Sequence, residues 1–332
     1  MKNLLLILSI LTITGCKNPN REITKEPPKK NTTTLSEIEE FLDDQAKKDS
    51  LHGVVLIADK DQILLKKAFG YRDLNQTTNH TLGGKIGLAS MPKMFTAISI
   101  MQLASEDKID IDNPIGIYLK DIENPLWRDI TVRNLLSHTS GLGFYWDYPP
   151  EEISADLDRL YTLIKKRDTT PKRQGVFNYS NNGYIVLGKI IQEVSGLTYE
   201  EYLTEHLIEP LKMSNTKLGL PDGGHFTSTA DDLLKFSKAL RNDKLISREV
   251  LNEMKRMQSD ENYGLGFKLG FIAKSEIYGH TGGFGSDDTV LGIASAMDII
   301  DDRYTVIVLT NRNPAMGGPK ALSFILNYLS KK

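Results

Sequence analysis

Cysteine is almost absent from the 332-residue chain, and its single cysteine, Cys16, excludes an internal disulfide framework and any cysteine-rich zinc or iron–sulfur site. The six histidines never pair as HExxH or HxH, so we expect neither a dedicated metal site nor a cofactor. An excess of cations is missing as well, because 41 basic side chains stand against 43 acidic ones, and no nucleic acid partner is expected. The composition, 40% hydrophobic and 25% charged, is typical of a globular enzyme.

An apolar run at residues 4–13 follows the basic Lys2, and it is too short for a membrane span, which needs about 20 residues. This is the layout of a secretion signal. The run ends in Ile13-Thr14-Gly15-Cys16, which resembles the lipobox of bacterial lipoproteins, where the cysteine receives lipid and becomes the new N-terminus. We therefore predict a lipoprotein signal peptide over 1–15, a lipid on Cys16, a flexible tether over 16–35, and a membrane-anchored protein of the cell envelope. The alternative is a simple secretory signal with an incidental thiol.

Strand patterns at both ends of the predicted domain, residues 36–332, enclose a long helical region. Ser36 followed by Glu39 predicts a capping box at the start of a first helix. The remaining predicted elements are strands at 52–58, 63–69, 263–272, 277–280, 289–297 and 304–309, helices over about 90–255, and a last helix at 319–329. This order predicts an α/β fold in which one sheet is assembled from both chain ends and flanked by the first and last helices, with a mostly helical lobe inserted.

The segment Ser90-Met91-Pro92-Lys93 is the first to suggest chemistry, because Lys93 is a charged exception at the start of a helical stretch that is apolar on nearly every face. Burying an ammonium costs several kcal/mol unless it has partners or a task. Proline is accepted in a first helical turn, which places Ser90 at the helix N-terminus, within reach of the Lys93 amine. This is the geometry of a nucleophile beside its base. The alternative is a helix cap beside a lysine that extends to solvent.

The same spacing recurs at Ser214 and Lys217, but no apolar helix follows, so Lys217 should be solvated. Two other motifs carry more weight. Tyr179-Ser180-Asn181 begins an apolar helical stretch, and His280-Thr281-Gly282-Gly283 ends a strand pattern. Taken singly, each is also compatible with an ordinary capped turn or β-turn.

The order of serine–lysine helix, tyrosine turn and glycine-bearing strand is similar to that of the serine β-lactamases and penicillin-binding DD-peptidases. The chain most resembles their class C-like branch, which includes carboxylesterases and D-aminopeptidases. Further stretches that look like this branch are residues 135–142, 228–233 and 263–267. The resemblance implies a β-lactamase/transpeptidase-like fold with an antiparallel sheet.

The resemblance also implies an acyl-enzyme on Ser90, with Lys93 and Tyr179 as candidate bases. Their pKa values, near 10 in free side chains, would both have to fall by about three units through burial and charge pairing. Asn181 would bind Lys93 and the substrate amide, and Thr281 would face the substrate.

Backbone N–H groups of Ser90 and Gly283 would form the oxyanion hole, and the absence of side chains at Gly282 and Gly283 would let the scissile bond approach the strand, so that bulk there abolishes turnover. His280 stands where most β-lactamases have lysine, which disfavours efficient β-lactam hydrolysis. We expect Trp146, in the aromatic segment 144–150, to form one wall of an acyl-side pocket. The alternative is that these rings pack the helical lobe.

The resemblance therefore implies a cell-envelope serine hydrolase acting on a small-molecule or peptide substrate, either a peptidase for D-Ala-D-Ala-type ends or an esterase. A true class C-like β-lactamase and a non-catalytic penicillin-binding or cell-wall sensor lipoprotein are the alternatives. The Gly-x-Ser-x-Gly elbow of α/β-hydrolases is absent from the chain, which sets that architecture aside.

Overall fold

The computed structural model describes residues 35–172, 174–285, 292–312 and 317–332. The predicted signal peptide, Cys16 and nearly all of the predicted tether lie outside the described residues. The signal peptide, the lipid on Cys16 and the tether therefore stay predictions.

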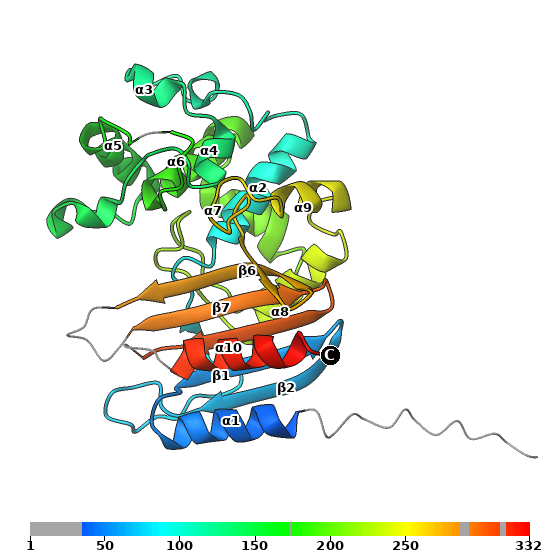
Figure 1. Cartoon of the computed structure of the whole chain (residues 1–332). Helices are drawn as coiled ribbons and strands as arrows, with labels where there is room; N and C mark the ends of the chain where they lie inside the picture. The colour runs from blue at the N-terminus through cyan, green and yellow to red at the C-terminus, as the bar shows by residue number, and fades with distance from the viewer. Residues whose placement is uncertain (1–34, 173, 286–291, 313–316) are drawn as a thin grey trace, which may run out of the picture.

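The centre of the fold is a six-stranded sheet in the order β2-β1-β8-β7-β6-β5, in which every neighbouring pair is antiparallel (Figure 1). β1 pairs with β8 along its whole length, from Gly53 opposite Thr310 to Asp59 opposite Tyr304. The predicted sheet from both chain ends is thereby confirmed. Its strands are β1 (Gly53–Asp59), β2 (Gln62–Phe69), β5 (Lys268–Ile272), β6 (Ser275–Phe284), β7 (Ile293–Ile300) and β8 (Tyr304–Thr310).

One face of the sheet is covered by the first and last helices, α1 (Ser36–Lys47) and α10 (Gly317–Leu329), as Figure 1 shows. Both helices send apolar side chains, including Ile38 and Ile325, into a buried cluster with the strands. Each such buried aliphatic side chain contributes about 1.5–3 kcal/mol. The predicted capping box is wrong: the N-cap of α1 is Leu35, Ser36 is already the first helical residue, and the Leu35 side chain makes no capping hydrogen bond.

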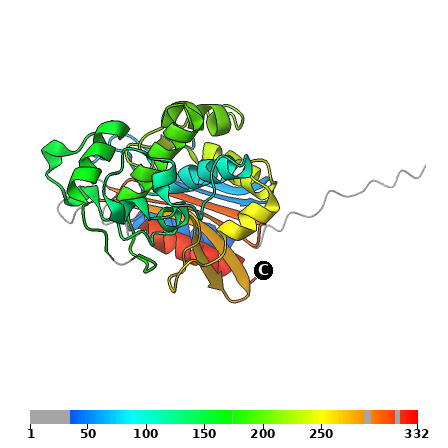
Figure 2. The same cartoon turned by 90° about the horizontal axis from the view of Figure 1, so that it is seen from above.

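The opposite face packs against the helical part of the chain, so the sheet lies between two apolar layers (Figure 2). α2 (Lys93–Ser105) runs through this second layer, buried on nearly all sides, and α8 (Ala230–Arg241) covers β1 and β8. The other helices here are α3 (Pro125–Arg128), α4 (Val132–Leu136), α5 (Leu157–Arg167), α6 (Asn181–Ser195), α7 (Tyr199–Leu203) and α9 (Arg248–Met254), with short helical turns η1 (Ile115–Ile117), η2 (Tyr145–Asp147), η3 (Pro150–Glu152) and η4 (Thr204–Ile208).

A second sheet of two short strands was not predicted, since each strand has only two residues. It pairs β3 (Ile86–Gly87) with β4 (Thr227–Ser228), and the Leu88 N–H extends the link by donating to the Phe226 carbonyl at 3.1 Å. β3 leads directly into Ser90. The two-stranded sheet therefore fixes the segment before Ser90 against the segment that precedes α8.

Candidate active site

Lys93 is fully buried at the first residue of α2 and uses its ammonium on three acceptors. Its Nζ donates to Ser90 Oγ at 3.2 Å, to Asn181 Oδ1 at 2.8 Å and to the backbone carbonyl of Asp222 at 2.7 Å. Desolvation lowers the pKa of Lys93 from 10.5 to about 8, and the negative charge of Asp222 opposes part of this shift. A substantial fraction of the amine is therefore neutral near pH 8, with its lone pair beside the Ser90 hydroxyl.

Tyr179 contributes a phenol to the same place, because its hydroxyl is hydrogen-bonded to the Ser90 side chain and the Lys93 Nζ lies 5.1 Å from its ring centroid. The expectation of a lowered pKa is wrong for this residue. Burial raises the pKa of Tyr179 above its ordinary value, and the hydrogen bond from Ser90 only partly opposes that. Lys93 is thus the better proton acceptor, and Tyr179 is a neutral phenol that can donate.

The Tyr-Ser-Asn turn is held at the N-terminus of α6. Ser180 is the N-cap of this helix, and its hydroxyl accepts the N–H of Gly183 at 2.9 Å, so Asn181 begins the helix with its amide directed at Lys93. The backbone N–H of Ser180 donates to Nδ1 of the buried His138 at 3.0 Å, and the His138 ring lies 4.0 Å from that of Tyr179. The segment 135–142 therefore positions the tyrosine turn.

His280 is buried and has both ring nitrogens engaged. Nδ1 lies 2.6 Å from the Thr281 carbonyl, which can only accept, so this nitrogen carries the proton and Nε2 accepts from the Tyr263 hydroxyl at 3.0 Å. Burial holds the pKa of His280 well below its usual value, and the positive charges of Lys93 and Lys268 act in the same direction. His280 is therefore a neutral, structurally fixed imidazole.

A cation that was not predicted from the sequence nevertheless lies next to Thr281. Lys268, at the start of β5, donates from Nζ to Thr281 Oγ1 at 2.6 Å. Lys268 pairs with Gly279 of β6, and Thr281 is two residues further along that strand. Lys268 and Thr281 therefore lie on the same face of the sheet. No pattern in the sequence predicted the contact between Lys268 and Thr281, because it depends on the register of β5 and β6.

The end of β6 forms an open edge beside Ser90. β5 pairs with β6 only as far as Gly279, so the segment from His280 to Phe284 extends beyond β5. A Cβ on Gly282 would lie 1.8 Å from the Leu88 carbonyl oxygen and 3.0 Å from the Ser90 nitrogen. Among the described residues, a Cβ on Gly283 would meet only the Ile293 carbonyl oxygen, at 3.9 Å. Gly282 thus makes room for the segment that carries Ser90, which differs from the substrate-clearance role expected of it.

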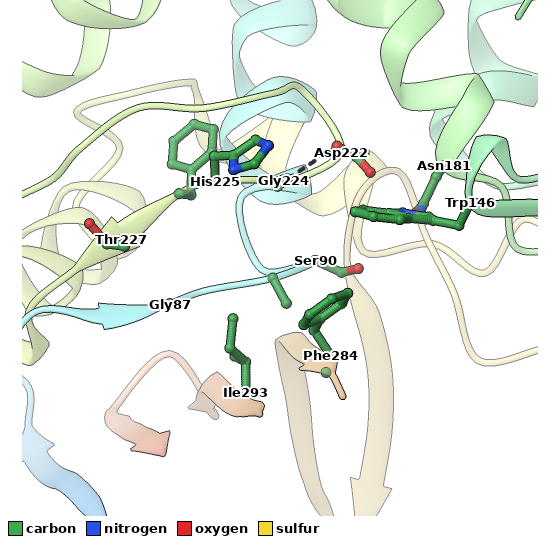
Figure 3. Close-up of a pocket in the computed structure, with 14 residues that line it drawn as sticks. Gly87, Ser90, Trp146, Asn181, Asp222, Gly224, His225, Thr227, Phe284 and Ile293 are labelled. Atoms are coloured by element: carbon green, nitrogen blue, oxygen red, sulfur yellow. Dashed lines mark hydrogen bonds between the residues drawn. The ribbon is translucent and has the colours of Figure 1, made fainter. Parts of the chain in front are cut away.

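A cavity of about 370 Å³ opens beside Ser90. Its described lining residues are Gly87, Ala89, Ser90, Trp146, Asn181, Asp222, Gly223, Gly224, His225, Phe226, Thr227, Gly283, Phe284 and Ile293 (Figure 3). Trp146 is 46% exposed, with its ring 5.7 Å from that of Phe284 and 4.9 Å from that of Tyr145, which is buried. Both alternatives for the aromatic segment therefore apply, to different residues: Trp146 faces the cavity, and Tyr145 packs inside the helical lobe.

Ser214 and Lys217 are both exposed, as expected for the second pair of this spacing. The pair at Ser90 and Lys93 therefore stands apart in burial and partners. Among the described residues there is no group of His, Cys, Asp and Glu side chains arranged to hold a metal ion.

The family model for Beta-lactamase matches residues 38–329. The chain belongs to this family. It is therefore a hydrolase of the serine type within the group of β-lactamases and penicillin-binding proteins, and the resemblance stated from the motifs is confirmed.

A curated relative in the family is the teichoic acid D-alanine hydrolase of Staphylococcus aureus, which is 26% identical over 291 residues, covering 78% of this chain and 70% of the relative. Two solved structures share the fold. The octameric penicillin-binding protein homologue from Pyrococcus abyssi aligns with a TM-score of 0.74 and 23% identity over 88% of this chain and 77% of its own. The D-amino acid amidase from Ochrobactrum anthropi aligns with a TM-score of 0.72 and 21% identity over 90% of this chain and 99% of its own.

Within the described residues, no helix has both the length and the apolar character that crossing a bilayer requires.

Proposed function

We propose that this protein hydrolyses esters or amides of D-amino acids through an acyl-enzyme on Ser90. The observation that carries the proposal is the buried Lys93 amine, which lies 3.2 Å from Ser90 Oγ and is fixed by Asn181 and the Asp222 carbonyl. A helix cap beside a solvated lysine would not bury this charge. A pure binding protein would gain nothing from the cost of burying it.

In the first step the neutral Lys93 amine takes the Ser90 proton as Oγ bonds to the substrate carbonyl carbon. The bond to the leaving group then breaks, and the leaving oxygen or nitrogen receives a proton from the Lys93–Tyr179 pair. In the second step water attacks the acyl carbon and loses a proton to the same pair. The bond between Ser90 Oγ and the acyl carbon then breaks, Ser90 Oγ takes this proton back, and the acid is released. Tyr179 suits the donor role because burial keeps its phenol protonated.

The oxyanion of each tetrahedral intermediate would be bound by the backbone N–H groups of Ser90 and Gly283. What supports this is the close approach of β6 to the Ser90 segment, where the site of a Gly282 Cβ is 3.0 Å from the Ser90 nitrogen. A preorganised donor of this kind contributes about 3–4 kcal/mol to the transition state.

The relatives support this substrate class. One is named for D-alanine removal from teichoic acid and another for D-amino acid amides. Both names describe an acyl group derived from a D-amino acid, joined to different leaving groups. Because His280 is neutral, it provides no charge for a β-lactam carboxylate, and Lys268 on Thr281 would have to bind that group instead.

A peptidase acting on D-Ala-D-Ala-type ends is the second candidate. Its leaving group is an amino acid with a carboxylate, and the Lys268 ammonium on Thr281 is a suitable partner for an anion at the open end of β6.

We further propose that the protein works in the cell envelope, carried there by the signal peptide over 1–15 and anchored by a lipid on Cys16. The sequence Ile13-Thr14-Gly15-Cys16 supports this, and the polar tether that follows would let the domain reach substrates near the membrane. Metabolic labelling with an alkynyl fatty acid tests the anchor. Incorporation should disappear in Cys16→Ala, and labelling that persists in this variant would contradict it.

Acyl-enzyme formation is tested by incubating the protein with a labelled penicillin and a short-chain p-nitrophenyl ester, followed by peptide mapping of the adduct. Ser90→Ala should lose both adduct and turnover, while Ser214→Ala, the matched control with the same Ser-x-x-Lys spacing, should keep them. An adduct that survives in Ser90→Ala would overturn the site assignment. Rapid turnover of nitrocefin would instead favour the β-lactamase alternative.

A further inference from the structure

Asp222 places a carboxylate in the cavity wall, and no step of the mechanism uses its charge. The residue is only 3% exposed, yet it lines the cavity together with Ser90 and Asn181. In Figure 3 its carboxylate lies on the side of the cavity that holds Asn181 and Trp146. Among the described lining residues it is the only acidic side chain.

The carboxylate is fixed in position without being neutralised. Tyr145 donates its hydroxyl to Oδ2 at 2.9 Å, and the Gly224 N–H donates to Oδ1 at 3.1 Å. A carboxylate accepts at about four lone-pair positions, so roughly half of its capacity remains. No lysine, arginine or histidine among the described residues forms an ion pair with it. The Lys93 ammonium acts on this charge electrostatically but donates its hydrogen bonds to other acceptors, so the remaining acceptor positions of the carboxylate are open to a cationic ligand.

Holding Lys93 does not explain this carboxylate. The contact to Lys93 Nζ is made by the backbone carbonyl of residue 222, which any amino acid would provide. The side-chain charge works against the proposed base, because it raises the pKa of Lys93 that burial lowers. A role in substrate recognition accounts for a charge that the catalytic step alone would not favour.

We propose that Asp222 binds the free α-ammonium group of an aminoacyl ester or amide while Ser90 attacks its carbonyl. This inference rests on the proposed function and narrows its substrate class. The ammonium of such a substrate is two bonds from the carbonyl carbon, and Asp222 and Ser90 line the same cavity. The rings of Trp146 and Phe284, which line the same cavity, also favour a cation. The acyl residue of a D-Ala-D-Ala peptide end is N-acylated and uncharged, so Asp222 selects against it.

The experiment compares D-alanine methyl ester with methyl isobutyrate, in which a methyl group replaces the ammonium and the shape is kept. The readout is the ratio of the two kcat/KM values, because damage to steps common to both substrates cancels in it. The ratio should fall by about 10- to 100-fold in Asp222→Asn, the loss expected for one charge-assisted hydrogen bond. Asp158→Asn, which removes an exposed carboxylate paired with Lys189, is the matched control and should keep the wild-type ratio.

A measurement on the wild-type protein alone guards against misfolding of the variant. 1-Aminoethylboronic acid should inhibit at least about 10-fold more strongly than isopropylboronic acid, its uncharged counterpart. Equal inhibition by the two boronic acids, or an equal loss of both ester activities in Asp222→Asn with the ratio unchanged, would overturn the role of Asp222. If the wild-type protein hydrolyses neither D-alanine methyl ester nor methyl isobutyrate, the proposed function itself is refuted.

Discussion

The clearest mechanical prediction concerns Gly282→Ala. The new Cβ would lie 1.8 Å from the Leu88 carbonyl oxygen and 3.0 Å from the Ser90 nitrogen, both backbone atoms that cannot rotate away. Relief to about 3.0 Å, the shortest separation that Cβ atoms tolerate, requires a movement of about 1.2 Å between β6 and the Ser90 segment. Misplacement of a reacting group by about 1 Å costs on the order of 100-fold in rate. We therefore expect kcat/KM to fall at least about 100-fold.

The assay is hydrolysis of a p-nitrophenyl ester together with the rate of labelling by penicillin, with the melting temperature measured in parallel. Gly270→Ala is the matched control, because it adds the same methyl group to a neighbouring strand where the nearest atom is the Ile277 Cβ at 4.0 Å. It should keep its activity. The melting temperature should fall in Gly282→Ala and stay unchanged in Gly283→Ala, whose Cβ has space within the protein. A Gly282→Ala protein as active as Gly270→Ala would refute the reasoning.

Three further predictions concern single side chains. The acylation rate should increase with pH through about 8, because burial lowers the pKa of Lys93 from 10.5 to about 8 and only the neutral amine accepts the Ser90 proton; a midpoint near 10.5 would contradict this. Trp146→Ala should raise KM with an unchanged melting temperature, since the ring lines the cavity and is 46% exposed, whereas a loss of stability alone would remove it from the substrate site. Burial raises the pKa of Asp298 from 3.8 to about 7, so the folded state favours the protonated acid, and the free energy of unfolding should decrease as the pH rises from about 4 to 7, by at most about 4 kcal/mol. Urea unfolding of Asp298→Asn should show a smaller decrease and greater stability at pH 8, and an unaltered pH dependence would show that another group is responsible.

Strong periodicity and rare motif order made the architecture predictable. The strand patterns at 52–69 and 304–309 gave β1, β2 and β8 to within a few residues, and the apolar stretch after Lys93 gave the buried α2. The boundaries were less accurate where turns intervene. The strand predicted from residue 263 begins at Lys268, because 263–267 are hydrogen-bonded to α4 and α9, with Gly266 at a positive φ of 84°.

The site could be predicted in its components but not in its electrostatics. The sequence order indicated Ser90, Lys93 and Tyr179, yet the direction of the Tyr179 pKa shift depends on how much water its hydroxyl loses, which is a property of the assembled fold. Lys268 and Asp222 were missed for a related reason. Lys268 lies in an ordinary strand and reaches the site only through the register of β5 on β6. Asp222 lies in a glycine-rich turn and reaches the site only through the placement of that turn.

The pairing of β1 with β8 has a consequence for biosynthesis. Roughly 250 residues separate these neighbours, so the contact is extremely non-local and its formation is slow. At about 5–20 residues per second, translation leaves β1 waiting roughly 10 to 50 s for the strand that covers its edge. During that interval the β1–β2 hairpin exposes one row of backbone groups to other nascent chains. A polypeptide that ends before Tyr304 lacks β8, so the backbone groups at this edge of β1 would stay unpaired. Such truncated chains should aggregate rather than fold into a smaller active domain.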